Sequence, residues 1–425
     1  MTAKWPSWAV ARDISNVQLT HAEVARYSRH LILPEMTITG QKRLKAGSVL
    51  CVGTGGLGSP LALYLAATGV GRIGLVDLDV VDASNLQRQI LHGTRDIDRP
   101  KLESAKETLQ DINPHVQIDC HETFLNSENA LEIIKEYDVI ADGTDNFPAR
   151  YLINDACVLL KKPDVYGGIF RFEGQVSVFF GAEGPCYRCL YPEPPPPGLA
   201  PSCMEAGVMG ILPGVIGLIQ ATEVVKLLTG LGEPLIGRLL LYDALPMTFR
   251  EIRLSKNKKC GLCGDEPTQK ELIDYEQFCG ITQIQNDQET LKEVRRMAAV
   301  MLRRLPVGTI SGEGPVIDPA SLNVKSVELK RRLDAGDPVV VLDVREPQEA
   351  MICSIPQSRL MSLEEISLRY KELDPKQETY VYCKGGVRSW GVALFLAQMG
   401  FDKVYNLEKG IVGWAEEVDP TMPKY

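Results

Sequence analysis

Residues 48–77 read SVLCVGTGGLGSPLALYLAATGVGRIGLVD, and this stretch decides the fold. An apolar run at 48–53 leads into a Gly-rich turn, residues 57–68 have helical patterning, and a second apolar run covers 73–77. A strand, a turn, a helix and a strand within about thirty residues form a βαβ unit, which requires a parallel sheet covered by helices. The sequence therefore predicts an α/β fold.

The glycines of the turn favour a bound nucleotide. Gly53, Gly55, Gly56 and Gly58 follow a strand and open a helix, so the backbone can turn tightly and approach a phosphate at a helix N-terminus. Asp77 ends the second strand 19 residues after Gly58 and can accept hydrogen bonds from ribose hydroxyls. A Gly-rich turn that binds no ligand is the alternative interpretation.

Outward from this unit, the chain divides into three predicted parts. The strand–helix rhythm fills 1–264, is lost in a linker region at 265–323, and returns in a smaller α/β domain at 324–425. A Pro-rich segment at 192–197 is expected to be an exposed loop. The other expected elements are strands at 116–120, 139–142, 175–180, 339–343 and 380–383, and helices at 326–335 and 390–399.

Composition narrows the class of protein. The chain has 425 residues and a net charge of −9, which argues against nucleic acid as a partner because phosphate contacts need clustered Lys and Arg. The most apolar stretch, 206–221, is interrupted by Gly and Pro and is shorter than a membrane span, so we expect a buried helix. The N-terminal residues lack the apolar core of a signal peptide. We therefore expect a cytoplasmic protein whose eleven cysteines are not a disulfide framework.

Charged and polar residues behind the second strand suggest chemistry at a phosphate. Asp79, Asn85, Arg88 and Lys101 follow the nucleotide-binding unit closely. Two cations that converge on a triphosphate suit attack at the α-phosphate, where charge builds on the transferring group. Hydride transfer needs no such clamp, so an NAD-dependent oxidoreductase is the weaker interpretation.

Four motifs in this order resemble the ubiquitin-activating-like adenylyltransferases of the MoeB and ThiF family, over about 26–264. Besides the Gly-rich loop they are Arg26-Tyr-Ser-Arg29-His, Asn85-Leu-Gln-Arg88-Gln with Pro100-Lys101, and Asp142-Gly-Thr-Asp145-Asn. The resemblance implies a Rossmann-like ATP-binding domain that adenylates the C-terminal glycine of a small ubiquitin-like sulfur-carrier protein, of the MoaD or ThiS type, ending in Gly-Gly.

The same resemblance implies roles for single residues. Asp77 would hold the ribose, while Asn85, Arg88 and Lys101 would contact phosphates. Asp145 would act with Mg²⁺, which prefers oxygen ligands. Arg29 would reach the active site of a neighbouring subunit, which implies a homodimer. Asp142 is expected to be a strand-end residue rather than a ligand.

Five cysteines of the first part separate into two groups. Cys186, Cys189, Cys260 and Cys263 form two C-x-x-C pairs that fit a tetrahedral zinc site, and the resemblance places the family's structural zinc there. A redox pair or unrelated core cysteines are the alternatives. Cys203 follows the Pro-rich loop, and the family has at this position a cysteine that bonds to the carrier. A buried packing role is the alternative for Cys203.

The third part carries a cysteine loop of its own. Cys383-Lys-Gly-Gly-Val-Arg388 follows an apolar strand and precedes a helix, so backbone N–H groups, Lys384 and Arg388 can stabilise a thiolate or persulfide. The loop resembles the rhodanese active loop, over about 326–417, with Cys383 as the sulfur carrier. A phosphatase is the alternative. The segment 352–357 departs from the usual His-Ile-Pro-Gly-Ala pattern.

Together the two resemblances point to one mechanism of the MoeZ type. The carrier's carboxylate is adenylated with Mg·ATP, and a persulfide on Cys383, loaded from a persulfide or thiosulfate donor, converts it to a thiocarboxylate for molybdopterin or related biosynthesis. Cys203 would resolve the linkage. Two rivals remain: an activating enzyme that conjugates the carrier through a Cys203 thioester, and a non-catalytic scaffold that only binds a carrier.

Overall fold

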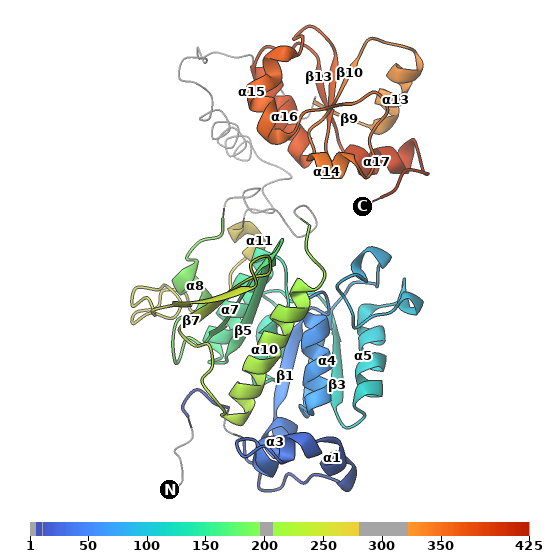
Figure 1. Cartoon of the computed structure of the whole chain (residues 1–425). Coiled ribbons are helices and arrows are strands. Elements are labelled where there is room, and N and C mark those ends of the chain that lie inside the picture. The colour runs from blue at the N-terminus through green and yellow to red at the C-terminus, as the bar shows by residue number, and fades with distance from the viewer. Residues whose placement is uncertain (1–5, 11, 196–206, 280–321, 425) are drawn as a thin grey trace. The chain divides into compact units, whose positions relative to one another are not determined.

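The structure is a computed structural model that describes residues 6–10, 12–195, 207–279 and 322–424. The chain divides into two compact units, Met1–Thr282 and Gln283–Tyr425. Each unit is an α/β structure around its own sheet, shown in Figure 1, and the two are described separately. The α/β fold class is confirmed.

The first unit is built on an eight-stranded sheet with the order β3-β2-β1-β4-β5-β6-β7-β8. The five strands from β3 to β5 run parallel, and β6, β7 and β8 extend the sheet in antiparallel fashion. The strands are β1 (Ser48–Val52), β2 (Arg72–Asp77), β3 (Gln117–Glu122), β4 (Val139–Asp142), β5 (Asp164–Phe170), β6 (Glu173–Phe179), β7 (Arg238–Asp243) and β8 (Thr248–Arg253).

Helices cover both faces of this sheet, because alternate residues of its central strand are buried on opposite sides. Val49 and Cys51 of β1 belong to one apolar core, and Leu50 and Val52 to another. Helices α4 (Gly58–Thr68), α5 (Lys101–Ile112) and α10 (Leu212–Thr229) pack on the first core, and α6 (Ala130–Ile134) and α7 (Phe147–Leu159) on the second. Among the residues that the structure describes, the other α-helices of this unit are α1 (His21–Arg26), α2 (Ser28–Leu31), α3 (Thr37–Ala46), α8 (Tyr187–Leu190) and α11 (Tyr275–Phe278).

The strand order creates a switch point beside β1. The chain leaves β1 toward β2 on one side and returns to β4 on the other, and open α/β sheets bind ligands where the order reverses, at the carboxyl ends of the strands. The predicted strands match β1 to β4 and β6 to within a few residues, whereas β5, β7 and β8 were not predicted from the sequence.

The apolar helix predicted near 206–221 is α10, which begins at Leu212. By length and composition α10 could cross a membrane, but 61% of it is buried inside the structure, where it packs on α4, β5 and β6. The helix is therefore a core element of the first unit, as Figure 1 shows.

The second unit has a five-stranded, all-parallel sheet with the order β11-β10-β12-β13-β9. Its strands are β9 (Asn323–Val324), β10 (Val340–Asp343), β11 (Arg359–Leu360), β12 (Thr379–Tyr382) and β13 (Val404–Leu407). Its helices are α13 (Ser326–Asp334), α14 (Pro347–Ala350), α15 (Leu363–Arg369), α16 (Val387–Gln398) and α17 (Gly410–Glu417). The helix predicted to begin at Trp390 begins three residues earlier, because the left-handed Gly386 ends the loop directly before it.

Candidate functional site

The Gly-rich loop of the first unit lies at the switch point, between the ends of β1 and β4. Gly53 has a φ of +91°, a conformation that favours glycine. A Cβ at Gly58 would lie 2.0 Å from the carbonyl oxygen of Gly53, so no side chain fits there. The loop backbone can therefore close tightly onto α4, which leaves the helix N-terminus open to an anion.

Asp77 fastens this loop to the end of β2. Its Oδ2 accepts hydrogen bonds from the backbone N–H of Thr54 at 2.8 Å and from the Thr54 hydroxyl at 2.7 Å. Its Oδ1 accepts from the N–H of Asp79 at 3.0 Å. Each carboxylate oxygen has two lone pairs, so Asp77 retains acceptor capacity for a ribose hydroxyl.

The predicted phosphate ligands surround the same loop. Lys101 opens α5 with its side chain only 5% exposed, and its Nζ lies 2.8 Å from Asp79 Oδ2. Arg88 donates to Asn85 Oδ1 at 2.7 Å. The Cδ of Arg88 lies 3.5 Å from where a Cβ of Gly56 would be, so this arginine is adjacent to the Gly-rich loop. Both cations are held by neutral or acidic partners that a phosphate could replace.

A histidine that sequence reasoning did not single out ties these parts together. His92 is buried, and one ring nitrogen lies 3.2 Å from the carbonyl oxygen of Thr54 while the other lies 3.0 Å from the hydroxyl of Ser104. Burial lowers the pKa of His92, which favours the neutral ring. A neutral ring that donates to Thr54 accepts from Ser104, so His92 fixes the loop to α5.

The end of β4 supplies the other side of the switch point. Asp142 is fully buried, and its Oδ1 accepts from the backbone N–H of Thr144 at 2.8 Å and from the Thr144 hydroxyl at 2.6 Å. Burial raises the pKa of Asp142. Asp145 is exposed, and the next residue, Asn146, caps α7 through the N–H of Ala149. Asp145 is thus the carboxylate of this motif that solvent reaches.

Arg29 lies at the opposite end of the sheet. It is exposed on α2, which packs on α3, and α3 leads directly into the amino end of β1. The Gly-rich loop follows the carboxyl end of β1. Arg29 therefore does not join the nucleotide site of its own chain.

An exposed apolar patch, which the sequence reasoning missed, lies at the carboxyl edge of the sheet. The turn between β5 and β6 contributes Phe172, and the turn between β7 and β8 contributes Leu245 and Met247, which are 72% and 68% exposed. Arg171, in the first turn, forms an isolated β-bridge with Val208. Gly210 lies close to the backbone of Gln87, because a Cβ at Gly210 would lie 2.2 Å from the carbonyl oxygen of Gln87. The segment 207–211, with exposed Met209 and Ile211, thus links the patch to the Asn85–Arg88 segment. The sequence signal that could have revealed this patch is the presence of apolar residues in the two hairpin turns.

The four predicted zinc ligands form one cluster. Their sulfurs lie within 4.8 Å of one another, with Cys186 at 3.9 Å from Cys189 and 3.7 Å from Cys260, and Cys189 at 3.4 Å from Cys263. Zn–S bonds of about 2.3 Å in a tetrahedron require sulfurs about 3.8 Å apart. Hydrogen bonds from Cys186 and Cys263 lower the pKa of Cys189 to about 2. The donor set and spacing fit a zinc ion.

An ion pair anchors this cluster to α7. Arg188, between the first two ligands, donates two hydrogen bonds to the fully buried Asp155, at 2.8 and 2.7 Å. Asp155 Oδ2 also accepts from the hydroxyl of Tyr275 at 2.8 Å and from Gln269 at 2.7 Å. One carboxylate therefore joins α7, the cysteine cluster and the segment that follows it.

Cys383 follows β12 in the second unit and is 1% exposed. Its Sγ accepts a hydrogen bond from the backbone N–H of Gly386 at 3.1 Å and lies 3.3 Å from the hydroxyl of Ser389. Gly386 has a φ of +92°, and a Cβ there would lie 2.0 Å from the carbonyl oxygen of Glu408. The loop thus folds around the sulfur and aims the N-terminus of α16 at it.

Arg388 of this loop is paired rather than directed only at the sulfur. Both of its terminal nitrogens lie 2.7 Å from the carboxylate of Glu349 on α14. Burial alone would raise the pKa of Glu349 and is the largest single effect on that group. The hydrogen bonds and positive charges around its carboxylate, those of Arg388 first among them, together outweigh burial, so the pKa of Glu349 is lowered. The positive charge expected from Arg388 is therefore partly neutralised, which the sequence alone did not reveal.

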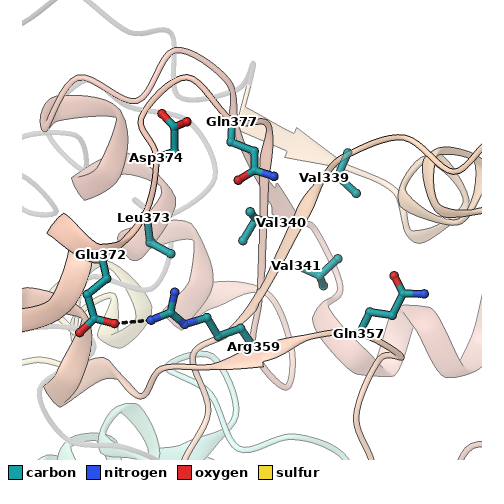
Figure 2. Close-up of a pocket in the computed structure, with 9 residues that line it drawn as sticks. All are labelled: Val339, Val340, Val341, Gln357, Arg359, Glu372, Leu373, Asp374 and Gln377. Atoms are coloured by element: carbon teal, nitrogen blue, oxygen red, sulfur yellow. Dashed lines mark hydrogen bonds and ion pairs between the residues drawn. The ribbon is translucent and has the colours of Figure 1, made fainter.

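A cavity of about 330 Å³ opens elsewhere on the second unit, and Figure 2 shows its lining. Val340 and Val341 of β10 form its floor, and Arg359 pairs with Glu372 at its side. Val340 lies beside Thr379 at the amino ends of the parallel strands, whereas Cys383 follows their carboxyl ends. The cavity is therefore separate from the sulfur site.

The cysteines outside the four-cysteine cluster and the Cys383 loop differ in exposure. Cys51 and Cys157 are buried in the cores, whereas Cys120 is exposed on β3. Cys203, predicted to bond to the carrier, lies outside the described residues. Cys353 is half-buried beside the core of the second unit.

Comparison with known families divides the chain into two parts, one in each compact unit of the structure. The model of the ThiF family matches residues 27–262, and that of the rhodanese-like domain matches residues 326–417.

Relatives share both parts. Over 413 residues the chain is 44% identical to the probable adenylyltransferase/sulfurtransferase MoeZ of Mycobacterium tuberculosis, with 96% of each chain covered. It is 41% identical over 428 residues to the adenylyltransferase and sulfurtransferase MOCS3 of Sus scrofa, with 96% of this chain and 89% of that one covered.

The first part has further matches of its own. It is 54% identical over 267 residues to the sulfur carrier protein adenylyltransferase of Thermus thermophilus, covering 62% of this chain and 98% of that one. The crystal structure of Escherichia coli MccB with MccA-N7isoASN shares the fold, with a TM-score of 0.52 and 22% identity over 57% of this chain and 75% of that one.

Proposed function

Because the chain belongs to the ThiF family and continues into a rhodanese-like domain, we propose that it adenylates the C-terminal glycine of a small ubiquitin-like sulfur carrier and then supplies that carrier with sulfur from Cys383. The chain is an adenylyltransferase and a sulfurtransferase, like the relatives it matches over nearly its full length. The product is a carrier thiocarboxylate for molybdopterin or related biosynthesis.

One observation carries the proposal: each unit gathers the groups that its own half-reaction needs. In the first unit Asp77 and Arg88 contact the Gly-rich loop, and Lys101 pairs with Asp79, whose backbone N–H donates to Asp77. In the second unit backbone and hydroxyl donors converge on the sulfur of Cys383. Each arrangement is built from residues of its own unit, which supports a separate half-reaction for each unit.

The first half-reaction is an attack by the carrier's carboxylate oxygen on the α-phosphorus of ATP. The bond to the bridging oxygen breaks, and pyrophosphate leaves with the electron pair. Gly53, Gly55, Gly56 and Gly58 cradle the phosphates, with Arg88 and Lys101 neutralising the developing charge. Asn85 orients Arg88, and Asp77 accepts from the ribose.

Two metals belong to the proposal. Mg²⁺ would be held by the exposed Asp145 together with phosphate oxygens, as is usual for this ion, and would neutralise phosphate charge. Zn²⁺ would be held by Cys186, Cys189, Cys260 and Cys263 and would stabilise the fold.

The second half-reaction uses the adenylate as an electrophile, because AMP is a far better leaving group than the oxygen of a free carboxylate. The outer sulfur of a Cys383 persulfide attacks the acyl carbon, AMP leaves, and the carrier is joined to Cys383 by an acyl disulfide. A second thiol, as its thiolate, then attacks the Cys383 sulfur, a disulfide forms between the two, and the thiocarboxylate leaves with the electron pair. We assign this second thiol to Cys203, and the sulfur donor is a persulfide or thiosulfate. An external thiol reduces the disulfide before the next cycle.

The carrier must bring its tail to the Gly-rich loop, and the apolar patch around Phe172, Leu245 and Met247 lies at the same edge of the sheet. We assign the patch to the body of the carrier, whose exposed apolar surface would cover it. The use of ATP and of free thiols fits a reducing compartment, so the proposal includes a cytoplasmic location.

Intact mass spectrometry tests the proposal directly. Candidate carriers ending in Gly-Gly are incubated with the protein, Mg·ATP and thiosulfate, and we expect a mass gain that matches exchange of one oxygen for sulfur. Lys101→Ala should abolish adenylate formation and leave transfer of sulfur from thiosulfate to cyanide intact, and Cys383→Ala should do the reverse. Loss of both activities from either folded variant would contradict the division of labour. An adenylate that passes to a Cys203 thioester instead would support conjugation.

A further inference from the structure

A chain of three polar contacts, of which the first two are buried, extends from the sulfur of Cys383 to the edge of the sheet. The hydroxyl of Ser389, in the first turn of α16, lies 3.3 Å from Cys383 Sγ and 2.6 Å from Asn406 Oδ1 on β13. The amide nitrogen of Asn406 donates to Asn323 Oδ1 on β9 at 2.8 Å. Cys383, Ser389 and Asn406 are all at most 2% exposed, so water does not substitute for the contacts of Ser389 with Cys383 and Asn406.

The chain leaves Ser389 with more acceptors than protons. Its hydroxyl has one hydrogen, and the acceptors within reach are Cys383 Sγ, Asn406 Oδ1 and the carbonyl oxygen of Gly386 at 3.1 Å. The Asn406 amide donates to Asn323 through its nitrogen and has its oxygen toward Ser389. Asn406 therefore competes with the sulfur for the Ser389 proton.

Charge on the sulfur decides this competition. A neutral thiol or the inner sulfur of a persulfide is a weak acceptor, so the closer Asn406 Oδ1 holds the proton. A thiolate is a far stronger acceptor, because hydrogen bonds to ionised groups are worth roughly twice those between neutral groups.

We propose that Ser389 is a catalytic residue whose hydroxyl turns to Cys383 Sγ whenever that sulfur is a thiolate, and that Asn406 is a positioning residue that takes the proton back when the sulfur is neutral. The inference rests on Cys383 as the sulfur carrier. In loading, the Cys383 thiolate attacks the outer sulfur of a donor persulfide, R–S–SH. An S–S bond forms between Cys383 Sγ and that outer sulfur, which gives a persulfide on Cys383, and R–S⁻ leaves with the electron pair. Ser389 stabilises the attacking thiolate and releases it once its charge is gone.

Other charged groups around Cys383 stay constant in the variants that test this. The ion pairs Arg388–Glu349 and Arg345–Asp343 flank the loop, and neither involves Ser389 or Asn406. The elements and loops around Cys383 carry titratable or charged side chains that include Asp343, Arg345, Glu349, Tyr380, Tyr382, Lys384, Arg388, Tyr405, Glu408 and Lys409. Substitution of Ser389 or Asn406 by an apolar residue alters none of these charges.

The test is the rate at which iodoacetamide alkylates Cys383 in the full-length chain as a function of pH, read by mass spectrometry of the peptide that contains Cys383. Ser389→Ala should move the midpoint of this profile up by about one pH unit, which is about a tenfold lower rate on the acidic side. Asn406→Leu, which preserves volume, should move the midpoint down. The double variant should behave like Ser389→Ala alone, because Asn406 acts only through the Ser389 proton.

Outcomes that would overturn the inference are distinct from loss of fold. Movement of both single variants in the same direction would mean that Asn406 supports Ser389 instead of competing with it. An additive double variant would mean that the two act separately. Ser389→Thr keeps the hydroxyl and should retain the wild-type midpoint, and failure of this rescue would also contradict the proposal. Alkylation requires no sulfur donor and no carrier, so it reads Ser389 even if the proposed sulfur transfer proves wrong.

Discussion

Gln357 occupies a backbone conformation that favours glycine. Its φ is +65°, in the left-handed region, and it is the position at which the usual rhodanese pattern has glycine. A side chain in this region costs about 1–2 kcal/mol, because the Cβ approaches the following carbonyl oxygen. The departure from the pattern noted in the sequence is thus a local destabilisation, away from Cys383.

Gln357→Gly should stabilise the second unit. We expect a gain of about 0.5–1 kcal/mol in the free energy of unfolding, since relief of strain exceeds the added entropy of the unfolded chain. Urea denaturation followed by circular dichroism measures it. Gln357→Ala is the matched control, because it removes the same exposed side chain but keeps the Cβ. An equal gain in both variants would refute the backbone explanation.

Asp164 carries a buried carboxyl group at the start of β5. It is 1% exposed, and its Oδ1 is without a hydrogen-bond partner among the described residues. Burial raises the pKa of Asp164 well above its usual range, and the nearby Asp142 adds to the shift. The folded chain therefore holds this proton at pH values where the unfolded chain has lost it.

The sign of the pH dependence follows from this difference. Where the folded state binds more protons, stability falls as pH rises, from the ordinary carboxyl range up through the raised pKa of Asp164. Asp164→Asn removes this pH-dependent loss, so the stability of the variant relative to wild type should increase as the pH is raised from 4 to 8. Urea midpoints at pH 4, 6 and 8 measure it, with exposed Asp111→Asn as control. A pH-independent difference would show that Asp164 does not titrate as inferred.

At the scale of elements, the βαβ unit was predictable because its signals are local. The buried run Ser48–Val52, the glycines after it and the apolar helix are adjacent in sequence, and their bounds agree with β1 and α4 to within a residue. Asp77 and Cys383 were predictable for the same reason, since each directly follows or ends a strand. The finer division into 1–264, 265–323 and 324–425 stays a prediction.

The missed elements lack such signals. β8 (Thr248–Arg253) is exposed at every residue, so it shows no alternation of buried and exposed positions. β5 begins with a buried Asp and contains Gly167-Gly168, where Gln220 and the Tyr166 hydroxyl fill the space that side chains would take. The Arg388–Glu349 pair joins residues 39 positions apart, which no local pattern reveals.

The cysteine cluster joins elements that are otherwise remote in the chain. Cys186 caps α8, whereas Cys260 and Cys263 follow β8, 74 residues later. We expect one zinc per chain by elemental analysis, with chelation lowering the thermal midpoint of the first unit by more than about 5 °C. Cys263→Ser should lose the metal, and Cys120→Ser, at an exposed cysteine outside the cluster, should keep it. A metal-free protein of unchanged stability would refute a structural zinc.

At the scale of the whole molecule, the position of Arg29 has a testable consequence. Arg29 lies at the end of the sheet opposite its own nucleotide loop, so its predicted role requires a second chain. Arg29→Ala and Lys101→Ala should each be inactive in adenylation. A mixture allowed to exchange subunits should recover about a quarter of wild-type activity, because half of the dimers are mixed and each has one intact site. Pyrophosphate release measures this, and a mixture that stays inactive would contradict a shared site.

The described part of the second unit begins close to one of its two shortest strands. β9 consists of two residues at the outer edge of the sheet, where Asn323 pairs with Asn406 and Val324 pairs with Leu407 of β13. Tension applied to the chain before Asn323 would load β9 first, because only two residue pairs join this strand to the sheet. The first side-chain contact to part would be the one from Asn323 to Asn406, two contacts from the sulfur. A displacement of β9 would therefore act first on Asn406 and, through Ser389, on the sulfur of Cys383.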